Sequence, residues 1–268
     1  MTMDGHDPRP PPRVVPLLDE LAGHATAPQI VEPLDGWRLR ASPDAPFRRA
    51  NSVLAIGALS DATVLDDAIS TVEEFYASNE RPPRFQVSPA AQPRGLDAVL
   101  EARGYVIEAP VVVMGAGATI VLGRTKGEGR ITKERGKRAW ERAYASMHGD
   151  DQRARDRVLA YGRAINALAL ASTAAVAPAE PGKGAAIGFA VAERGWTGIF
   201  GMGTRPEARR RGAATAVLHT LTRWAVENDS PRLYLQVEED NDAARTLYTR
   251  AGFVDTYRYH YRTLRSPR

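Results

Sequence analysis

The sequence predicts a mixed α/β fold arranged as two lobes, each built around a β-sheet. The chain has 268 residues, more than one ordinary domain, and 43% of them are hydrophobic, which is enough for a substantial core. In the C-terminal half, apolar runs of strand length alternate with helical patterns. A segment of the N-terminal half also resembles one of the C-terminal half, which indicates two related lobes.

The composition of two short stretches sets the boundaries of the lobes. The proline-rich stretch D-P-R-P-P-P predicts a disordered tail over residues 1–12. The polar stretch G-R-T-K-G-E-G predicts a connection over residues 123–132. We therefore expect an N-terminal lobe at 13–122 and a C-terminal lobe at 133–268.

The C-terminal lobe is expected to begin with two helices and three strands. Amphipathic spacing predicts helices over 133–147 and 151–168, and a strand is expected around 172–176. After a polar break at 179–184, two apolar runs follow that are compatible with β-strands. They are separated by a hairpin-like break at Arg194-Gly195 and cover residues 186–193 and 196–204.

The same lobe closes with a helix, a strand, a helix and a strand. Helical spacing predicts a helix over 213–227, which N-D-S-P ends, and a strand follows at 232–238. The D-N-D stretch at 240–242 supplies N-cap residues for a helix that runs through Arg250. The last strand ends at Y-H-Y.

An internal similarity links the two lobes. Residues 96–114 resemble residues 244–262 when the G-Y of the first segment is placed on the G-F of the second. F-Q-V at 85–87 likewise resembles L-Q-V at 235–237. The two lobes are therefore predicted to be a duplication.

An arginine-rich turn with a glycine opens directly into the helix over 213–227. Arg209, Gly212 and Ala214 satisfy the spacing R/Q-x-x-G-x-G/A, in which small residues let backbone N–H groups approach an anion at a helix N-terminus. We call residues 209–215 the anion-binding loop, and this chemistry suits a pyrophosphate. Walker A and Rossmann glycine motifs are absent, so both of these nucleotide-binding readings are excluded.

With this loop, two further marks make the C-terminal lobe resemble the GNAT superfamily of N-acetyltransferases. They are N-D-A-A-R-T-L-Y at 241–248 and the pair Gly252-Phe253. The resemblance covers roughly the last 85 residues, and the three marks together are specific. The N-terminal lobe is in turn similar to the first part of two-lobed GNAT proteins through G-W-R-L-R at 36–40 and R-A-N-S-V at 49–53. Together with the internal similarity, these resemblances imply a tandem GNAT fold with a complete C-terminal lobe and a degenerate N-terminal copy.

The resemblance also implies a site for acetyl-CoA as co-substrate in the C-terminal lobe. Backbone groups of Met202, Gly203 and Thr204 are expected to hold the pantetheine arm, and Asn241 is expected beside the cofactor. The residues expected to hold the pyrophosphate are those of the anion-binding loop: Arg209, Arg210, Arg211, Gly212, Ala213, Ala214 and Thr215.

Two side chains are candidates for the proton transfers. The resemblance gives Tyr248 the task of protonating or stabilising the departing thiolate. Many family members carry a glutamate on the strand at 196–204, which here has no carboxylate. Glu238, at the end of the next strand, is the candidate base; alternatively, Glu238 and Glu239 only supply negative charge ahead of a helix N-terminus.

The N-terminal copy is predicted to be catalytically silent. Leu100 stands at the position of Tyr248, and nothing between residues 52 and 85 reproduces the anion-binding spacing. This lobe could wall off the acceptor pocket, complete an interface or only stabilise the other lobe. Trp37, Asn51 and Tyr76, with Arg49 and Arg84, could line an acceptor pocket. Alternatively the aromatic residues are ordinary core or rim residues and the arginines are solvated.

Composition excludes several other classes of function. The chain has no cysteine, which excludes an acyl-cysteine relay, a disulfide scaffold and a thiolate metal site. The histidines lack metal-binding spacing, so no metal is expected. The net charge is only +4, and in the most basic segment, 126–142, glutamates alternate with the basic residues, so no nucleic-acid partner is expected.

We also expect a cytoplasmic protein with no membrane partner, either a monomer or a homodimer. The first residues lack a secretory pattern, and the longest apolar run, 109–123, is too short and glycine-broken to span a membrane. The predicted function is acetyl transfer from acetyl-CoA to a primary amine of a small molecule, either a metabolite or an antibiotic. Acetylation of a protein lysine or N-terminus and a non-catalytic acyl-CoA-binding module are the alternatives.

Overall fold

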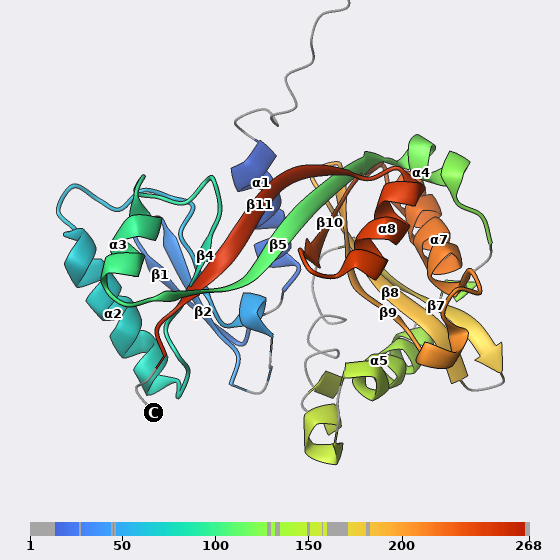
Figure 1. Cartoon of the computed structure of the whole chain (residues 1–268), viewed down its shortest axis with the longest axis horizontal. Coiled ribbons are helices and arrows are strands. Elements are labelled where there is room, and N and C mark those ends of the chain that lie inside the picture. The colour runs from blue at the N-terminus through green and yellow to red at the C-terminus, as the bar shows by residue number, and fades with distance from the viewer. Residues whose placement is uncertain are drawn as a thin grey trace, which may run out of the picture.

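A computed structural model describes residues 14–26, 28–43, 45, 47–127, 130–131, 135–148, 151–156, 158–159, 171–180 and 183–265 (Figure 1). In this part of the chain, eleven strands form one mixed sheet in the order β1-β2-β3-β4-β11-β5-β10-β9-β8-β7-β6. Two long neighbouring strands, β5 (Val106–Gly117) and β11 (Val254–Thr263), run across the middle of the molecule.

The first half of the molecule comprises the elements before β5. They are α1 (Val14–His24), β1 (Ile30–Leu34), β2 (Trp37–Ala41), the 3-10 turn η1 (Arg48–Ala50), β3 (Val53–Leu54), α2 (Leu65–Ser78), β4 (Arg84–Val87) and α3 (Leu96–Ala102). In α2, buried residues recur at helical spacing: Ala68, Ile69, Val72, Phe75 and Tyr76. They pack with Trp37 and Phe85 in one hydrophobic core.

The second half comprises the elements between β5 and β11. They are α4 (Ala118–Arg124), β6 (Arg130–Ile131), α5 (Arg135–His148), β7 (Ala171–Glu180), β8 (Lys183–Glu193), β9 (Trp196–Thr204), the 3-10 turn η2 (Pro206–Ala208), α7 (Ala213–Glu227), β10 (Arg232–Glu238) and α8 (Asp242–Ala251). A second core lies between α7, α8 and the sheet, and includes Val217, Leu221 and Leu235.

The predicted elements of the second half are largely confirmed. The strand pair β8 and β9, helix α7, strand β10, helix α8 and strand β11 lie where the sequence indicated. Strand β7 runs through Glu180, past its predicted end, because it pairs with β8 along its length. Helix α4 extends into the start of the predicted connection at 123–132. Of the predicted helix at 151–168, residues 152–156 are helical, and most of the rest lies outside the described residues, as does the tail at 1–12.

The two halves exchange their closing strands. Strand β5 leaves the first half and pairs with β10 of the second, from Glu238 opposite Val111 to Arg232 opposite Gly117. Strand β11 leaves the second half and pairs through its last residues with β4. The sheet is therefore continuous across the predicted division at residue 122, and the domain boundaries themselves stay a prediction.

The internal similarity has a structural counterpart. Gly104 and Gly252 both have positive φ, +85° and +101°. The amide of Tyr105 donates to the carbonyl of Leu100 at 3.0 Å, and the amide of Phe253 donates to that of Tyr248 at 3.0 Å. Helices α3 and α8 therefore end in the same way.

The strand register repeats as well. Gln86 of β4 lies opposite Tyr261, and Gln236 of β10 lies opposite Val113. Tyr261 and Val113 occupy equivalent positions in the internal alignment.

None of the helices in the described part of the chain is long and apolar enough to cross a membrane.

Candidate functional site

The central feature of the site is a gap between two parallel strands of the second half. Strands β9 and β10 pair from Trp196 opposite Arg232 to Ile199 opposite Leu235, and the pairing stops there. Just beyond that point β9 carries one extra residue relative to β8, and Gly201 has a φ of +56°. Two neighbouring parallel strands thus diverge, leaving backbone groups of β9 and β10 available in the gap.

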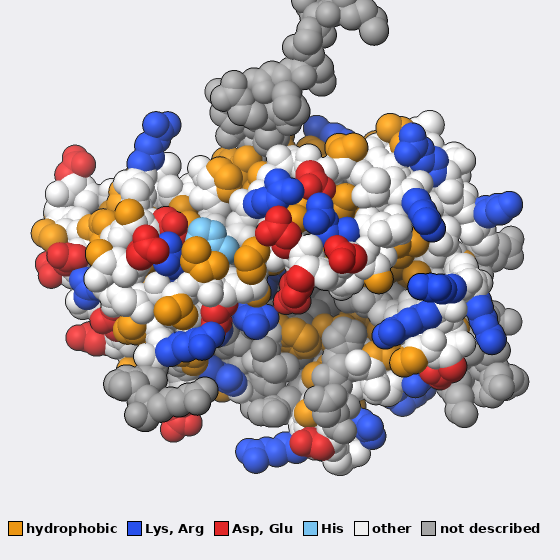
Figure 2. Space-filling model, viewed as in Figure 1, with side chains coloured by type: hydrophobic (Ala, Val, Ile, Leu, Met, Phe, Trp, Pro, Cys, Tyr) orange, Lys and Arg blue, Asp and Glu red, His pale blue; other side chains and the backbone are white. Residues whose placement is uncertain are grey.

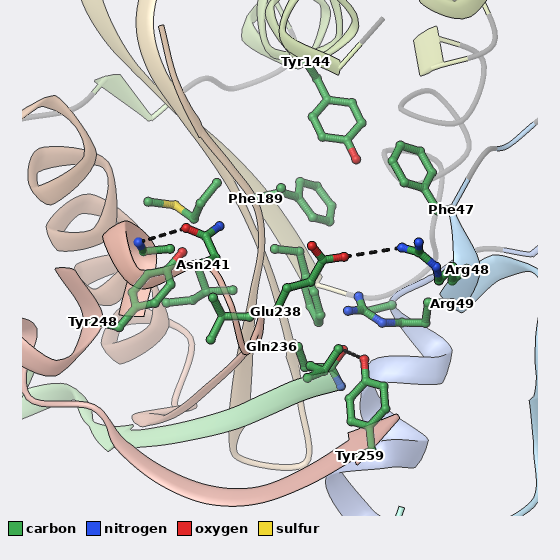
Figure 3. Close-up of a pocket in the computed structure, with 18 of the residues that line it drawn as sticks. Phe47, Arg48, Arg49, Tyr144, Phe189, Gln236, Glu238, Asn241, Tyr248 and Tyr259 are labelled. Carbon is green, nitrogen blue, oxygen red and sulfur yellow. Dashed lines mark hydrogen bonds and ion pairs between the residues drawn. The ribbon is translucent and has the colours of Figure 1, made fainter. Parts of the chain in front are cut away.

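The gap opens into a cavity of about 510 Å³, within the range of small-molecule sites. Strands β9 and β10 line its middle, α8 lines one side, and the segment around η1 and helix α5 line the other. Figure 3 shows Tyr248 and Asn241 on one side, Arg48, Arg49 and Phe47 on the other, with Glu238 reaching between them. Figure 2 shows the middle of this face hollowed, with acidic and basic side chains along the rim.

Tyr248 places a buried hydroxyl on the side of the cavity formed by α8. Its side chain lines the cavity, is 6% exposed, and packs edge-on against Phe253 at a centroid distance of 5.9 Å. Burial raises the pKa of Tyr248 above its ordinary value, so the phenol stays protonated. Its hydroxyl has no hydrogen-bond partner among the described residues, so it can donate to a group in the cavity.

Asn241 and Glu238 flank the end of β10. The side-chain oxygen of Asn241 accepts from the amide of Ala244 at 3.1 Å and caps α8, which is why this residue type stands there. Glu238 ends β10, and its side chain is 56% exposed at the cavity mouth. Its carboxylate lies 3.4 Å from the guanidinium of Arg48. The structure therefore brings Tyr248, Asn241 and Glu238 around one cavity.

The anion-binding loop lies between η2 and α7. Arg210 and Gly212 have φ values of +59° and +81°, and Gly212 is the N-cap of α7. A Cβ on Gly212 would meet nothing within 4 Å, so glycine is favoured there by backbone conformation and not by space. The first turn of α7 contains no carboxylate, and the first amides of a helix lack intrahelical acceptors. Residues 209–212 are exposed.

The loop and the gap together fit a long ligand that carries phosphates. The described residues that line the cavity include Met202, while Gly203 and Thr204 continue β9 beyond it toward η2 and the loop. A flexible arm in the gap could pair with freed backbone groups, and its diphosphate could meet the amides of α7. Arg209, Arg211, Ala213, Ala214 and Thr215 surround that helix terminus in sequence.

The three side chains predicted to touch an acceptor do not line the cavity. Trp37 and Tyr76 are completely buried in the first half, where the indole donates to the carbonyl of Gln92 and the phenol to that of Arg40, both at 2.9 Å. Asn51 is also buried, and its amide nitrogen donates to the carbonyls of Ala45 and Phe47. The two aromatic rings complete the core of the first half, and the polar atoms of all three side chains donate to backbone carbonyls, so the expectation of acceptor contact is corrected.

Several lining residues were not predicted. Phe47, Arg48, Tyr144 and Gln236 line the cavity, together with Arg49, which the sequence did suggest. A signal existed for Gln236, because it lies two residues before Glu238 on one strand and therefore shares its face. Among the described residues, no group of three or more His, Asp and Glu could hold a metal ion.

Comparisons with known proteins agree with this geometry. A family model described as "Probable histone acetyltransferase Rv0428c C-terminal" matches residues 20–262. The curated protein "Uncharacterized N-acetyltransferase YobR" of Bacillus subtilis is 27% identical over 251 residues, which cover 92% of this chain and 98% of that protein.

Two solved structures share the fold. A GCN5-related N-acetyltransferase from Kribbella flavida matches with a TM-score of 0.68 and 15% identity, over 95% of this chain and 96% of that one. A tandem GNAT protein from the clavulanic acid biosynthesis pathway matches with a TM-score of 0.56 and 15% identity, over 76% of this chain and 70% of that one. The chain belongs to the family of the matching model and is a GNAT-superfamily N-acetyltransferase, an enzyme of the acyltransferase class.

Proposed function

We propose that this enzyme transfers an acetyl group from acetyl-CoA directly to a primary amine of a small molecule. The observation that carries the proposal is the gap between β9 and β10, which opens onto a cavity containing a buried tyrosine hydroxyl without a described partner. The turn η2 connects the end of β9 to the exposed N-terminus of α7. One ligand with a thioester at one end and a diphosphate farther along could occupy both features.

The residues around the gap divide the binding task. Backbone groups of Met202, Gly203 and Thr204 would pair with the pantetheine arm. The amides and side chains from Arg209 to Thr215 would hold the diphosphate, which the positive end of α7 favours. Asn241 would lie beside the arm, with its oxygen already committed to the cap of α8 and its amide group left to donate.

The bound co-substrate supplies an activated acetyl carbonyl, and the protein supplies placement and proton transfer. A bond forms between the amine nitrogen and the acetyl carbon as the carbon–sulfur bond breaks. Glu238, directly or through water, would take the proton that the ammonium must lose, because a free alkylamine has a pKa near ~10. Tyr248 would donate a proton to the departing sulfur, and the second proton, which the nitrogen loses as the amide forms, would restore the phenol directly or through water.

A small acceptor is favoured because both halves and α5 contribute to the walls of the cavity. A protein lysine is the second candidate, and the description of the matching family as a probable histone acetyltransferase favours it. The cavity walls opposite Tyr248 come from Phe47, Arg49 and Tyr144, and the acceptor would share the cavity of about 510 Å³ with the thioester end.

The experiment is thiol release from acetyl-CoA with a panel of amines. The chain has no cysteine, so the free thiol that appears comes only from coenzyme A. Release with small amines supports the proposal. Release with lysine-containing peptides alone would move the assignment to a protein acetyltransferase. Binding of acetyl-CoA without release for any amine or peptide would indicate an acyl-CoA-binding module.

A further inference from the structure

The cavity that receives the acceptor is rich in hydrogen-bond donors. Among the described residues that line it, the charged side chains are Arg48, Arg49 and Glu238. Two arginines and one carboxylate give this lining a net positive charge, and Arg48 lies 3.4 Å from Glu238. A ligand that fits such a wall must bring hydrogen-bond acceptors and negative charge.

Arg49 is held inside the cavity and not in bulk solvent. Its guanidinium lies over the ring of Phe200, 5.6 Å from the centroid. It also lies near Tyr259, where burial raises the pKa of the phenol and the positive charge of Arg49 acts in the opposite direction. Both aromatic residues line the same cavity.

The turn that carries Arg49 is fixed from behind. The Asn51 amide nitrogen donates to the carbonyls of Ala45 at 2.9 Å and Phe47 at 3.0 Å, and its oxygen accepts from the amide of Ser42 at 2.8 Å. These bonds hold η1 from both sides. Asn51 is therefore a positioning residue for Arg49, although it does not itself reach the cavity.

Gln236 supplies a second donor on the cavity wall. Its oxygen accepts from the hydroxyl of Tyr259 at 3.3 Å, whereas its buried amide nitrogen has no hydrogen-bond partner among the described residues. The buried indole nitrogen of Trp140, which also lines the cavity, has none either. Buried donors of this kind are costly unless a ligand or water accepts from them.

The first half shows what satisfies the equivalent glutamine. Gln86 occupies on β4 the position that Gln236 occupies on β10, and its amide nitrogen donates to the carboxylate of Asp19 at 3.3 Å. The same carboxylate accepts from Tyr257 at 2.8 Å, and the positive charge of Arg40 acts on it. In the first half, the carboxylate of Asp19 accepts from the glutamine. At the cavity, Gln236 lies beside Tyr259 and Arg49, and none of these three is a carboxylate.

We infer that the acceptor is a small amine that also carries a carboxylate or a similar anionic group, which Arg49 and Gln236 bind. The inference rests on the proposed function and names its substrate class. Figure 3 shows Arg49 on the side of the cavity opposite Tyr248, so an acceptor with its amine near Glu238 directs its anionic end toward the first half. Polycationic acceptors, such as polyamines or lysine-rich peptides, are disfavoured by the net positive charge of the lining.

The first experiment compares amines that differ only in the anionic group. Phenylalanine is compared with phenethylamine and phenylalaninamide, and leucine with isoamylamine, by thiol release from acetyl-CoA. We expect the carboxylate member to have the higher kcat/KM by about 10- to 100-fold, the usual range for a charge-assisted hydrogen bond. Arg49→Gln should remove this difference, Arg49→Lys should retain part of it, and Arg258→Gln, an exposed arginine outside the cavity, should leave it unchanged.

The second experiment measures binding without catalysis. Protein saturated with coenzyme A is titrated with 3-phenylpropionate and with the neutral 3-phenylpropionamide. We expect only the carboxylate to bind, and both Arg49→Gln and the isosteric Gln236→Glu to weaken it about 10-fold or more. The Gln236→Glu variant keeps the test valid if the arginine variant does not fold.

The outcomes separate this inference from the proposed function. Equal rates within every pair, preference for spermidine or a lysine-rich peptide, or carboxylate binding that ignores Arg49 would overturn the inference while leaving an acetyltransferase. Arg49-dependent carboxylate binding with no thiol release from any amine would support the anion site and overturn the proposed function. Absence of carboxylate binding in the unaltered protein would also overturn the inference.

Discussion

Helices α2 and α7 occupy corresponding places in the two halves but present opposite charge at their N-termini. Each follows a strand that pairs in parallel with the next strand, β3 with β4 and β9 with β10. The first turn of α2 contains Asp66 and Asp67, whereas the first turn of α7 contains no carboxylate and follows three arginines. An anion is therefore attracted to α7 and repelled at α2.

The next pair of corresponding helices, α3 and α8, also differs at the position of the candidate catalytic tyrosine. Helix α8 places Tyr248 against the cavity, and α3 places Leu100, completely buried, at the equivalent position. Position 88, which corresponds to Glu238, is a serine that hydrogen-bonds to Asp19. From these differences we infer that the first half does not bind the co-substrate. Its contribution is the wall formed by Phe47, Arg48 and Arg49.

The largest effect is expected from a negative charge in the anion-binding loop. In Gly212→Asp a carboxylate would face the diphosphate, and two like unit charges 4 Å apart near a surface repel by about 4 kcal/mol. We expect coenzyme A affinity to fall about 100-fold or more in calorimetry. The control is Gly95→Asp, because Gly95 is also a helix N-cap, at φ +87°, with nothing within 4 Å of its Cβ position. An equal loss of coenzyme A affinity in both variants would contradict a binding site confined to the second half.

The second prediction concerns the tyrosine that has no counterpart in the first half. Tyr248→Phe should lower turnover about 100-fold or more, because the sulfur then leaves without a proton donor. The affinity for coenzyme A should change little. Tyr105→Phe is the matched control, since Tyr105 stands at the position of Phe253 and its hydroxyl donates to Glu73 at 3.0 Å, away from the cavity. Unchanged turnover in Tyr248→Phe would remove this residue from the mechanism.

A smaller effect is expected at the end of β10. Glu238→Gln should reduce turnover about 10- to 100-fold near neutral pH, and the loss should shrink as pH approaches ~10, where the amine sheds its proton unaided. Glu239→Gln serves as the control, because that carboxylate pairs with Arg258 at 3.1 Å and does not line the cavity. A pH-independent loss, or an equal loss in the control, would contradict the role of a base.

The smallest effect is expected at Asp19, the carboxyl group that accepts from Gln86 in the first half. Burial raises the pKa of Asp19 to about 6, against the bonds from Ser88 and Tyr257, which lower it. The pKa of Asp19 in the unfolded chain is ~3.9, so the folded state holds the proton more tightly. The contribution of Asp19 to the free energy of unfolding is therefore fully present below pH ~4 and is lost as pH rises through about 6. Over about two pH units this amounts to at most about 3 kcal/mol.

Asp19→Asn should remove that pH dependence. The measurement is urea unfolding of both proteins at pH 4 and pH 7, with the difference between the two pH values compared across the two proteins. A difference that is the same in the variant would show that folding does not raise the pKa of Asp19, and the pH dependence assigned to this residue would be wrong.

Local sequence patterns predicted the elements of the second half, whereas the resemblance to the GNAT superfamily indicated Tyr248, Asn241 and Glu238. These three residues lie around one cavity because they belong to the end of β10 and to α8, which adjoin it. The exchange of β5 and β11 was not predictable in this way. Either strand could satisfy β4 or β10 by its own pattern, and the choice is made by tertiary packing.

The acceptor side of the cavity was predicted less well for a different reason. Trp37 and Tyr76 are amphipathic residues that suit a core as well as a pocket, and only the structure shows their polar atoms bonded to backbone carbonyls. Arg48 and Arg49 lie in a short 3-10 turn without periodicity, so no pattern indicates that they face strands of the other half. Contacts between distant segments carry no local signal.

If the second half alone binds the co-substrate, isothermal titration calorimetry on the whole chain will give a stoichiometry of one coenzyme A per chain. Gly212→Asp should abolish this binding, and Gly95→Asp should retain it. Two molecules per chain, or none at concentrations that saturate related enzymes, would contradict a single binding site in the second half.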